Sequence, residues 1–455
     1  MTKTPDSKTA FLWGAATSSH QIEGHNQHND WWAWEAKGKV DGGVRSGAAT
    51  DHLNRFREDM RLAKELGLNS YRFSFEWSRF EPLEGAWEKT ACDWYGELIS
   101  ECEAHGLLPM ATLLHFTIPQ WLAEQGGFAS DETPEKFARF TRKIAAQFGS
   151  RIPIWCTVNE PMVLVSGSYL ARFMPPSEYN PTAASTASAN LFKCHVLAYD
   201  ILKSEITVRQ GPFREHPVEV GFAHNMMHFL PERRFHPFEN FLARILSFLH
   251  NDAWLIAVNG EKQKFGFAGI FPPAKQYMSG RNRRTYDFIG INYYTKSYIR
   301  WRPRTHNKDF NPELQLGINF ARRGEVASDL EWAIHPRGFK LMLEKLRRFK
   351  APIYITENGI ADSKDQYRRD YLQKHLHVVA EAIKSGLDIR GYYYWSLLDN
   401  FEWVKGFWPR FGLYAVDYDS FVRTARPSAA FYRDVIKAHA NGESPSVQTI
   451  YKLST

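Results

Sequence analysis

Residues 154–161 read IWCTVNEP, and this stretch, together with a second one like it, decides the fold. Its apolar and β-branched residues have the length and composition of a buried strand. The strand ends in asparagine and glutamate before a proline, and residues 352–359, PIYITENG, reach a glutamate in the same way. A turn alone would explain one such end, because proline fixes its own backbone and favours an extended residue before it. Two of them indicate a sheet that presents carboxylates where its strands end.

The rest of the chain repeats this pattern of a short apolar run followed by a longer amphipathic segment. Such alternation is typical of a parallel sheet with helices on its faces. Eight units predict an α/β fold, a closed (β/α)8 TIM barrel with extended βα loops. An open doubly wound sheet is the alternative, but no GxGxxG follows the first predicted strand. The predicted strands are residues 11–18, 70–77, 108–116, 152–159, 218–224, 287–294, 352–356 and 389–396. The predicted helices are residues 53–66, 90–105, 135–148, 187–202, 238–259, 336–349, 365–385 and 428–440.

No linker rich in glycine, serine or proline divides the chain, so residues 1–455 are expected to form a single catalytic barrel domain. With 44% hydrophobic residues, the chain can bury a large core. Its longest irregular segment, residues 302–327, follows the sixth predicted strand. Loops of this length inside a domain are often lids over a functional site, and we expect that role here.

Charge and cysteine content narrow the class of protein. The net charge of +7 raises the question of nucleic acid, but the basic residues are scattered pairs without a recognition module, so no nucleic-acid partner is expected. The four cysteines form no CxxC motif and are predicted to be buried free thiols. The N-terminal residues lack an apolar leader, and no uninterrupted apolar run has the length of a membrane span. We therefore expect a soluble, cytoplasmic protein; the oligomeric state is left open.

Polar and aromatic side chains occupy the ends of seven of the eight predicted strands. Catalytic groups of such barrels lie at the C-terminal ends of the strands. Each residue alone has a plainer explanation, since a glutamate there is usually solvated and a lone histidine usually belongs to the core. Their joint occurrence favours an active site. The residues are Gln21, Arg72, His115, Asn159, Glu160, Asn292, Tyr294, Glu357, Trp395, Asp399, Glu402 and Trp403.

Two of these residues, Glu160 and Glu357, follow the fourth and seventh predicted strands and would face each other across the barrel. Paired carboxylates are the apparatus of glycoside hydrolysis, in which one group donates a proton while the other stays ionised. Their surroundings must push the two pKa values apart. We expect Arg72 and Tyr294 to favour ionised Glu357, and burial together with that charge to keep Glu160 protonated.

A cofactor or metal is not expected, because this chemistry needs none and no His, Asp or Glu cluster has ligand spacing. The HLH sequence at residues 375–377 lies in a predicted helix with the wrong spacing for ligands on one face. We interpret it as surface.

The ordered motifs resemble glycoside hydrolase family one, the retaining β-glucosidases and their relatives. The resemblance runs from FLWGAATSSHQIEG at Phe11 to RFGLYAVDY, which begins at Arg410. Between them lie DWWAWE, YRFSFEWSR, TVNEP, DFIGINYYT, ITENG and WSLLDNFEW. In this order and spacing the set is highly specific.

The resemblance implies a role for each site residue. Glu160 would be the general acid/base and Glu357 the nucleophile of an exo-acting, retaining β-glycosidase. Arg72, Asn292 and Tyr294 would position the nucleophile. Substrate-binding residues would be Gln21, His115, Asn159, Trp395, Glu402, Trp403 and Phe411, with Trp395 beneath the sugar ring and Phe411 beside its C6 group.

The same resemblance refines the substrate. Its phospho-glycosidase branch has a small residue in place of Glu402, so an unphosphorylated β-D-glycoside is expected here. Its thioglucosidase branch has glutamine in place of Glu160, so ordinary O-glycosides are expected. Phe116 stands where the family usually has tryptophan, and His20 where it usually has another aromatic residue. These departures leave the preference among glucosides, galactosides and fucosides open.

Two other functions use the same residues. A transglycosidase would transfer the sugar to an acceptor instead of water, and apolar residues of the 302–327 loop would favour it only weakly. A catalytically idle sugar-binding barrel would be expected had either glutamate been lost, and both are present. Hydrolysis of small-molecule β-glycosides is therefore the leading hypothesis.

Overall fold

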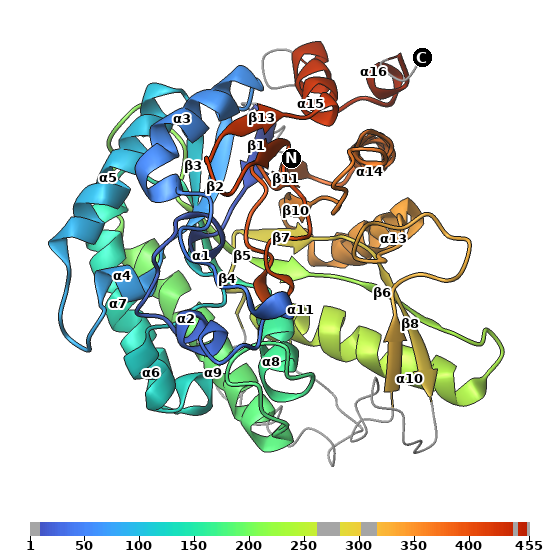
Figure 1. The fold of residues 1–455 in the computed structure, drawn as a ribbon, viewed down its shortest axis with the longest axis horizontal. Coiled ribbons are helices and arrows are strands. Elements are labelled where there is room, and N and C mark those ends of the chain that lie inside the picture. Colours follow the sequence, from blue (N-terminus) through green and yellow to red (C-terminus); the bar gives the residue numbers. More distant parts are fainter. Residues whose placement is uncertain (1–9, 262–282, 302–315, 440–444, 453–455) are drawn as a thin grey trace, which may run out of the picture.

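A computed structural model describes residues 10–261, 283–301, 316–439 and 445–452. Eight parallel strands close into a barrel at its centre (Figure 1), which confirms the predicted (β/α)8 fold. The order around the ring is β1-β11-β10-β7-β5-β4-β3-β2, so the first and last of these strands seal it. Each predicted strand coincides with one of them and differs only at its ends. They are β1 (Leu12–Ala16), β2 (Ser70–Ser74), β3 (Leu108–Leu114), β4 (Ile154–Asn159), β5 (Glu219–Asn225), β7 (Phe288–Asn292), β10 (Ile353–Asn358) and β11 (Ile389–Trp395).

Helices surround the barrel and match the eight predicted segments (Figure 1). The largest difference is α9 (Pro181–Glu205), which begins earlier than the prediction because the Asn180 side chain accepts from the Ala183 N–H and Pro181 suits a first turn. The other long helices are α3 (His52–Glu65), α5 (Lys89–Ala104), α7 (Thr133–Phe148), α10 (Pro237–Ser247), α13 (Pro336–Leu346), α14 (Arg368–Lys384) and α15 (Pro427–Ala438). Shorter ones are α1 (Ser19–Ile22), α2 (Asp30–Glu35), α4 (Trp77–Phe80), α6 (Gln120–Glu124), α8 (Pro161–Tyr169), α11 (Ala253–Val258), α16 (Val447–Lys452), the 3-10 turns η1 (Asp41–Gly43), η2 (Gly127–Ala129), η4 (Arg347–Phe349) and η5 (Trp403–Lys405), and the π turn η3 (Phe248–Asp252).

The barrel strands bury both of their faces. Tyr393 and Trp395 of β11 pack in the cluster inside the barrel, whereas Tyr392 and Tyr394 belong to the larger cluster between strands and helices. This alternation follows from the two-residue period of a strand. Both faces meet apolar partners, which explains why the strands read as continuous apolar runs instead of alternating patterns.

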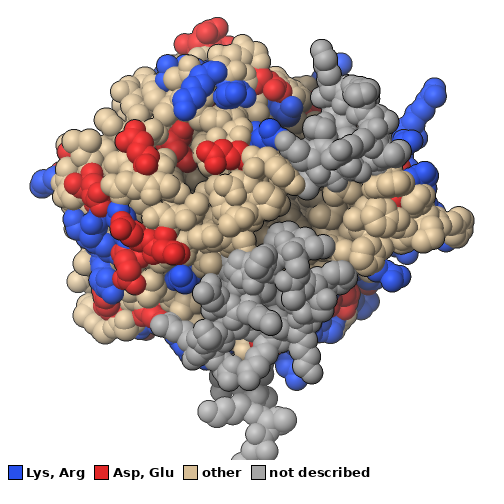
Figure 2. All heavy atoms as spheres, turned by 90° about the horizontal axis from the view of Figure 1, so that it is seen from below, with Lys and Arg blue, Asp and Glu red and all other residues tan. Residues whose placement is uncertain are grey.

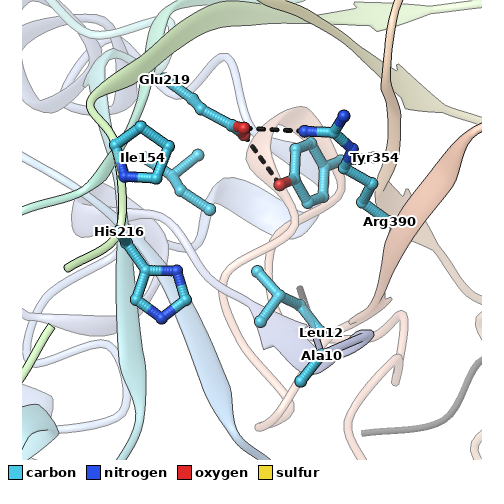
Figure 3. Close-up of a pocket in the computed structure, with 8 residues that line it drawn as sticks. Ala10, Leu12, Ile154, His216, Glu219, Tyr354 and Arg390 are labelled. Atoms are coloured by element: carbon cyan, nitrogen blue, oxygen red, sulfur yellow. Dashed lines mark hydrogen bonds and ion pairs between the residues drawn. The ribbon is translucent and has the colours of Figure 1, made fainter. Parts of the chain in front are cut away.

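The N-terminal ends of the strands enclose a small pocket at the floor of the barrel (Figure 3). Its polar group is Glu219, which accepts hydrogen bonds from the Tyr354 hydroxyl at 2.8 Å and from Arg390 Nη1 at 2.9 Å. Leu12 and Ile154 supply apolar walls. The floor thus joins five strands, since these residues come from β1, β4, β5, β10 and β11.

Two small sheets accompany the barrel. One contains β6 (His228–Pro231), β8 (Lys296–Trp301) and β9 (Leu316–Asn319), and the other β12 (Tyr414–Val416) and β13 (Arg423–Ala425). The first corrects the expectation that residues 302–327 are irregular, because β9 pairs antiparallel with β8 and sets Leu316 opposite Trp301. Residues 302–315 of the predicted lid lie outside the described residues.

One surface expectation, that of His375, is wrong. His375 is fully buried against Tyr371, whose ring centroid lies 3.8 Å away, because α14 turns this residue toward the barrel. The helical run Pro237–Val258, α10 through α11, is long and apolar enough to cross a membrane by length and composition, although 28% of its most apolar window is buried. The expectation that the chain does not span a membrane stays a prediction.

Charged side chains of both signs lie side by side on the face shown in Figure 2. Pairs such as Arg57–Glu97 and Lys89–Asp93 neutralise basic side chains locally. The four cysteines (Cys92, Cys102, Cys156 and Cys194) are free and buried, as predicted.

Candidate active site

The C-terminal ends of the barrel strands bring the predicted site residues together. Register shifts in the strand pairing occur just before both glutamates, between Cys156 and Asn159 on β4 and between Ile355 and Glu357 on β10. Such bulges turn side chains in a new direction and are common beside active sites. Glu160, which follows β4, has left-handed backbone (φ 45°), a conformation that costs free energy and often marks functional positions.

Glu357 is buried and held by two charged or polar partners. Arg72 Nη1 lies 2.6 Å from its Oε1, and the Tyr294 hydroxyl donates to its Oε2 at 2.5 Å. Arg72 is itself fully buried and donates from Nη2 to Asn159 Oδ1 at 2.7 Å. The two side chains predicted to favour ionised Glu357 are therefore in contact with it.

Glu160 accepts two amide hydrogen bonds on a single oxygen. Asn292 Nδ2 lies 2.8 Å and Asn225 Nδ2 3.2 Å from Glu160 Oε1, while Oε2 has no hydrogen bond to a described residue. Asn292 is oriented by the Thr356 hydroxyl, which donates to its Oδ1 at 2.6 Å. The free oxygen, Oε2, is the one available to a ligand.

The surroundings of the two carboxyls differ in charge. Burial, then the charge of Glu357, raises the pKa of Glu160 to about 8. Burial also raises the pKa of Glu357, but the Arg72 guanidinium and the Tyr294 hydroxyl oppose that rise. The pair titrates as a unit. A proton shared between them resides on Glu160, because only Glu357 contacts a cation.

The remaining predicted residues form a second group beside the glutamates. Gln21 Nε2 donates to Glu402 Oε2 at 3.3 Å and to Asn400 Oδ1 at 2.9 Å. Burial, then the charge of Glu357, raises the pKa of Glu402 to about 8. This group presents amide and carboxyl atoms suited to the hydroxyls of a sugar.

Aromatic rings line the same side. His115 stacks on Trp395 with centroids 6.0 Å apart and on Trp403 with centroids 6.1 Å apart. Burial, then the charge of Arg72, holds the pKa of His115 well below its usual value, so its ring is neutral. Phe411 packs against Trp395 in the interior cluster and lies edge-on to Tyr294.

Known proteins share this arrangement of sequence and structure. Residues 5–441 match the model of the family described as glycosyl hydrolase family 1. The chain belongs to glycosyl hydrolase family 1. Like its relatives it is a β-glycosidase, a β-glucosidase-type glycoside hydrolase that acts on small-molecule glycosides.

Three relatives show how far the likeness to family 1 extends. β-Glucosidase A of Thermotoga maritima is 31% identical over 457 residues, which cover 94% of this chain and 97% of that one. The β-galactosidase of Pyrococcus woesei is 29% identical over 499 residues, with coverage of 94% and 96%. The solved β-glycosidase from Pyrococcus horikoshii superposes with a TM-score of 0.84 at 36% identity, covering 100% and 98%.

The two departures from the family 1 pattern, His20 and Phe116, both contact Trp403. His20 stacks on Trp403 with centroids 5.7 Å apart, and its Nε2 lies 2.8 Å from Glu35 Oε1. Phe116 meets Trp403 edge-on at 5.2 Å. Both residues therefore contact Trp403, and neither has a hydrogen bond to Glu160 or Glu357.

Three contributors were missed from the sequence. Asn225 ends β5, one residue beyond the predicted strand, and contacts Glu160. Thr356 orients Asn292, and Asn400 contacts Gln21. The polar end of β5 was a usable signal for Asn225, because β5 was the one predicted strand without an assigned site residue at its end. Thr356 and Asn400 act through other side chains, so only the fold reveals them.

Among the described residues no group of three or more His, Cys, Asp or Glu side chains is placed to hold a metal ion. The site offers carboxyl, amide and aromatic groups, and family 1 chemistry is built from these.

Proposed function

We propose that the chain is an exo-acting, retaining β-glucosidase that also accepts β-galactosides and β-fucosides. It hydrolyses unphosphorylated β-D-glycosides by double displacement, with Glu357 as nucleophile and Glu160 as general acid/base. The observation that supports this assignment best is the asymmetry of the two carboxyls. Arg72 and Tyr294 bind both oxygens of Glu357, whereas burial beside that charge raises the pKa of Glu160 to about 8.

In the first step Glu357 attacks the anomeric carbon while Glu160 Oε2 donates its proton to the leaving oxygen. The Glu357–sugar bond forms as the glycosidic bond breaks, and the aglycone departs as an alcohol. Arg72 and Tyr294 keep the nucleophile ionised and oriented, which is the positioning that makes such a step fast.

In the second step a water molecule replaces the aglycone. Glu160, now ionised, takes a proton from the water, which attacks the anomeric carbon and releases Glu357. Two inversions give net retention. This mechanism predicts roughly 5–5.5 Å between the carboxyl groups of Glu160 and Glu357, whereas an inverting enzyme needs roughly 6.5–9.5 Å.

The preference for an unphosphorylated sugar follows from the surroundings of Glu402. Its neighbours Gln21 and Trp395 carry no charge, and after burial the charge of Glu357 has the largest influence on its pKa. A phosphate group needs cationic donors, and these neighbours supply none.

The test is release of nitrophenol from aryl β-glycosides of the gluco, galacto, fuco, manno and 6-phospho-gluco series. Activity on unphosphorylated gluco, galacto and fuco substrates, with the first sugar product in the β configuration by NMR, is expected. Glu357→Ala should lose at least roughly 10⁴-fold, because the covalent route is gone. An α product, or an undiminished Glu357→Ala variant, would refute the retaining mechanism.

Glu160→Ala gives a separate test of the acid/base role. Its kcat/KM, which reports the first step, should stay near the wild-type value on dinitrophenyl glucoside, whose leaving group needs no proton, and should fall steeply on alkyl glucosides. Added azide should accelerate it and yield the β-glucosyl azide, because azide needs no general base. Equal losses on both substrates would assign the proton donor elsewhere.

A further inference from the structure

A chain of hydrogen bonds extends from Glu160 to a histidine outside the predicted site. Asn225 Nδ2 donates to Glu160 Oε1 at 3.2 Å, and Asn225 Oδ1 lies 2.9 Å from His250 Nε2. The amide oxygen can only accept, so His250 must donate from Nε2. The ring is therefore the neutral tautomer with its proton on Nε2 whenever Asn225 faces Glu160 in this way.

The orientation of the Asn225 amide decides what Glu160 meets. With the amino group toward Glu160, as here, both Asn225 and Asn292 donate to Oε1, and Oε1 carries no proton. With the amide turned over, its oxygen would face Oε1 and accept a proton from it. The proton would then sit on Oε1, away from the oxygen that faces a ligand.

His250 is held by the fold in the position that selects between these two orientations. It lies in the π turn η3, a kind of local widening that is frequent at functional sites. Asn251, next to it, fastens the turn to the strand end by accepting from Met227 N–H at 2.9 Å and donating to Met227 O at 2.8 Å. Phe229 meets the His250 ring edge-on at 5.5 Å.

We propose that His250 is a positioning residue for the acid/base: its Nε2–H fixes the Asn225 amide, and the amide keeps the proton of Glu160 on Oε2. This inference rests on the proposed role of Glu160 as proton donor. His250 touches neither substrate nor reacting atoms and acts through Asn225.

The surroundings of His250 keep its ring neutral. Burial lowers the pKa of His250 to about 4, so the ring carries no charge at neutral pH, and the neighbouring His224 is neutral for the same reason. The groups that face Glu160 are Glu357 of β10, Arg72 of β2, Tyr294 after β7 and Glu402 after β11. Losing the Asn225 donor removes an influence that lowers the pKa of Glu160.

The test compares His250→Leu, which cannot donate, with His250→Gln, whose side-chain amino group can reach the place of Nε2. For alkyl glucosides, whose leaving group needs a proton, kcat/KM of His250→Leu should fall roughly 10-fold, a part of the whole general-acid effect. For dinitrophenyl glucoside it should fall less than about twofold. The basic limb of the pH profile should move to higher pH, and His250→Gln should restore most of both.

His195→Leu is the control, since His195 is a buried histidine whose ring nitrogens bond to Thr157 and Thr285 and not to Asn225. It should lower the melting temperature without altering leaving-group or pH dependence. If His250→Leu does not fold, His250→Asn, too short to reach Asn225, takes its place. If folded His250→Leu or His250→Asn loses activity equally on alkyl and dinitrophenyl glucosides, the role of His250 is overturned. If Glu160→Gln also loses activity equally on the two substrates, the role of Glu160 itself is overturned.

Discussion

At the scale of single residues, the site places a small number of charged groups in a buried environment. Glu160, Glu357 and Glu402 lie within electrostatic reach of each other, and Arg72 is a cation in contact with Glu357. One guanidinium cannot neutralise three carboxylates, so burial leaves protons on Glu160 and Glu402, whose pKa values are both about 8. The proposed roles of Glu357 as nucleophile and Glu160 as acid thus follow from which carboxyl Arg72 contacts.

Arg72→Met should cut kcat at least roughly 100-fold, because Glu357 loses its cation and its alignment. Arg72 lowers the pKa of Glu357, so the variant's nucleophile has a higher pKa and the acid limb of the pH profile moves to higher pH. Unfolding should become easier by about 3–5 kcal/mol, because a buried charge is left without its partner. A pH–rate profile and a urea titration measure both; an unmoved acid limb would contradict the assignment.

Glu160→Gln should stabilise the protein increasingly as pH rises. The folded pKa of about 8 lies above the usual 4.5, so the folded protein keeps a proton that the unfolded chain releases between those values. The wild type therefore loses free energy of unfolding as pH rises through that window, and the neutral amide does not. The gap between them should grow by about 4 kcal/mol from pH 5 to pH 9.

Thermal melting at several pH values checks this linkage. The surface variant Glu97→Gln is the control, since its side chain is 57% exposed and its stability difference should stay constant. A constant gap for Glu160→Gln as well would mean that Glu160 is ionised in the folded protein.

At the scale of elements, the ends of strands matter more than their middles. β10 continues from Glu357 through Asn358 to Gly359, where a Cβ atom would lie 1.8 Å from the backbone oxygen of Trp395. The strand ends that carry Glu357 and Trp395 are therefore in direct backbone contact. The glycine of the ITENG motif is required by this approach of β11 to β10.

Gly359→Ala should reduce kcat/KM roughly 100-fold, because either Glu357 or Trp395 must move by about 1 Å. It should also destabilise the fold by about 1–3 kcal/mol through overpacking. Gly96→Ala is the contrasting variant, since a Cβ there meets no atom within 4 Å inside α5. That change should stabilise the helix by about 0.5–1 kcal/mol and leave activity alone. Wild-type kinetics in Gly359→Ala would show that the strand ends can separate freely.

The strands, their order and the glutamates at their ends were predictable, because β-branched runs such as residues 154–158 are distinctive by themselves. The register shifts before Glu160 and Glu357 were not, since a bulge depends on how a neighbouring strand pairs. His375 was misplaced for a related reason: its burial is decided by how α14 packs, and spacing alone does not reveal it. β9 was hidden in a polar stretch because its partner β8 defines it.

At the scale of the whole molecule, the barrel separates chemistry from stability. The mouth carries Glu160 and Glu357, while the floor carries Glu219 with Tyr354 and Arg390. Residues at the bottom of such barrels serve stability, and those at the top serve catalysis. Figure 3 shows the floor contacts drawn from separate strands.

Glu219→Gln should therefore lower the free energy of unfolding by about 1 kcal/mol and leave kcat/KM within about twofold of wild type. The effect stays small because Arg390 also pairs with Asp388. Urea denaturation and nitrophenyl glucoside kinetics on one preparation measure both quantities. A tenfold loss of activity would mean that the floor and the mouth are coupled.

The pairing of β1 with β11 has a consequence for synthesis. Trp13 lies beside Tyr392 in the finished sheet, so the first strand waits for a partner that the ribosome adds almost last. At roughly 5–20 residues per second, that wait is on the order of 20–80 s. Throughout it, the edge of β1 that will pair with β11 stays open to solvent or to any chaperone at hand. The site can be completed only after residue 402 has left the ribosome, because the hydrogen bond between Gln21 and Glu402 joins the first part of the barrel to the last.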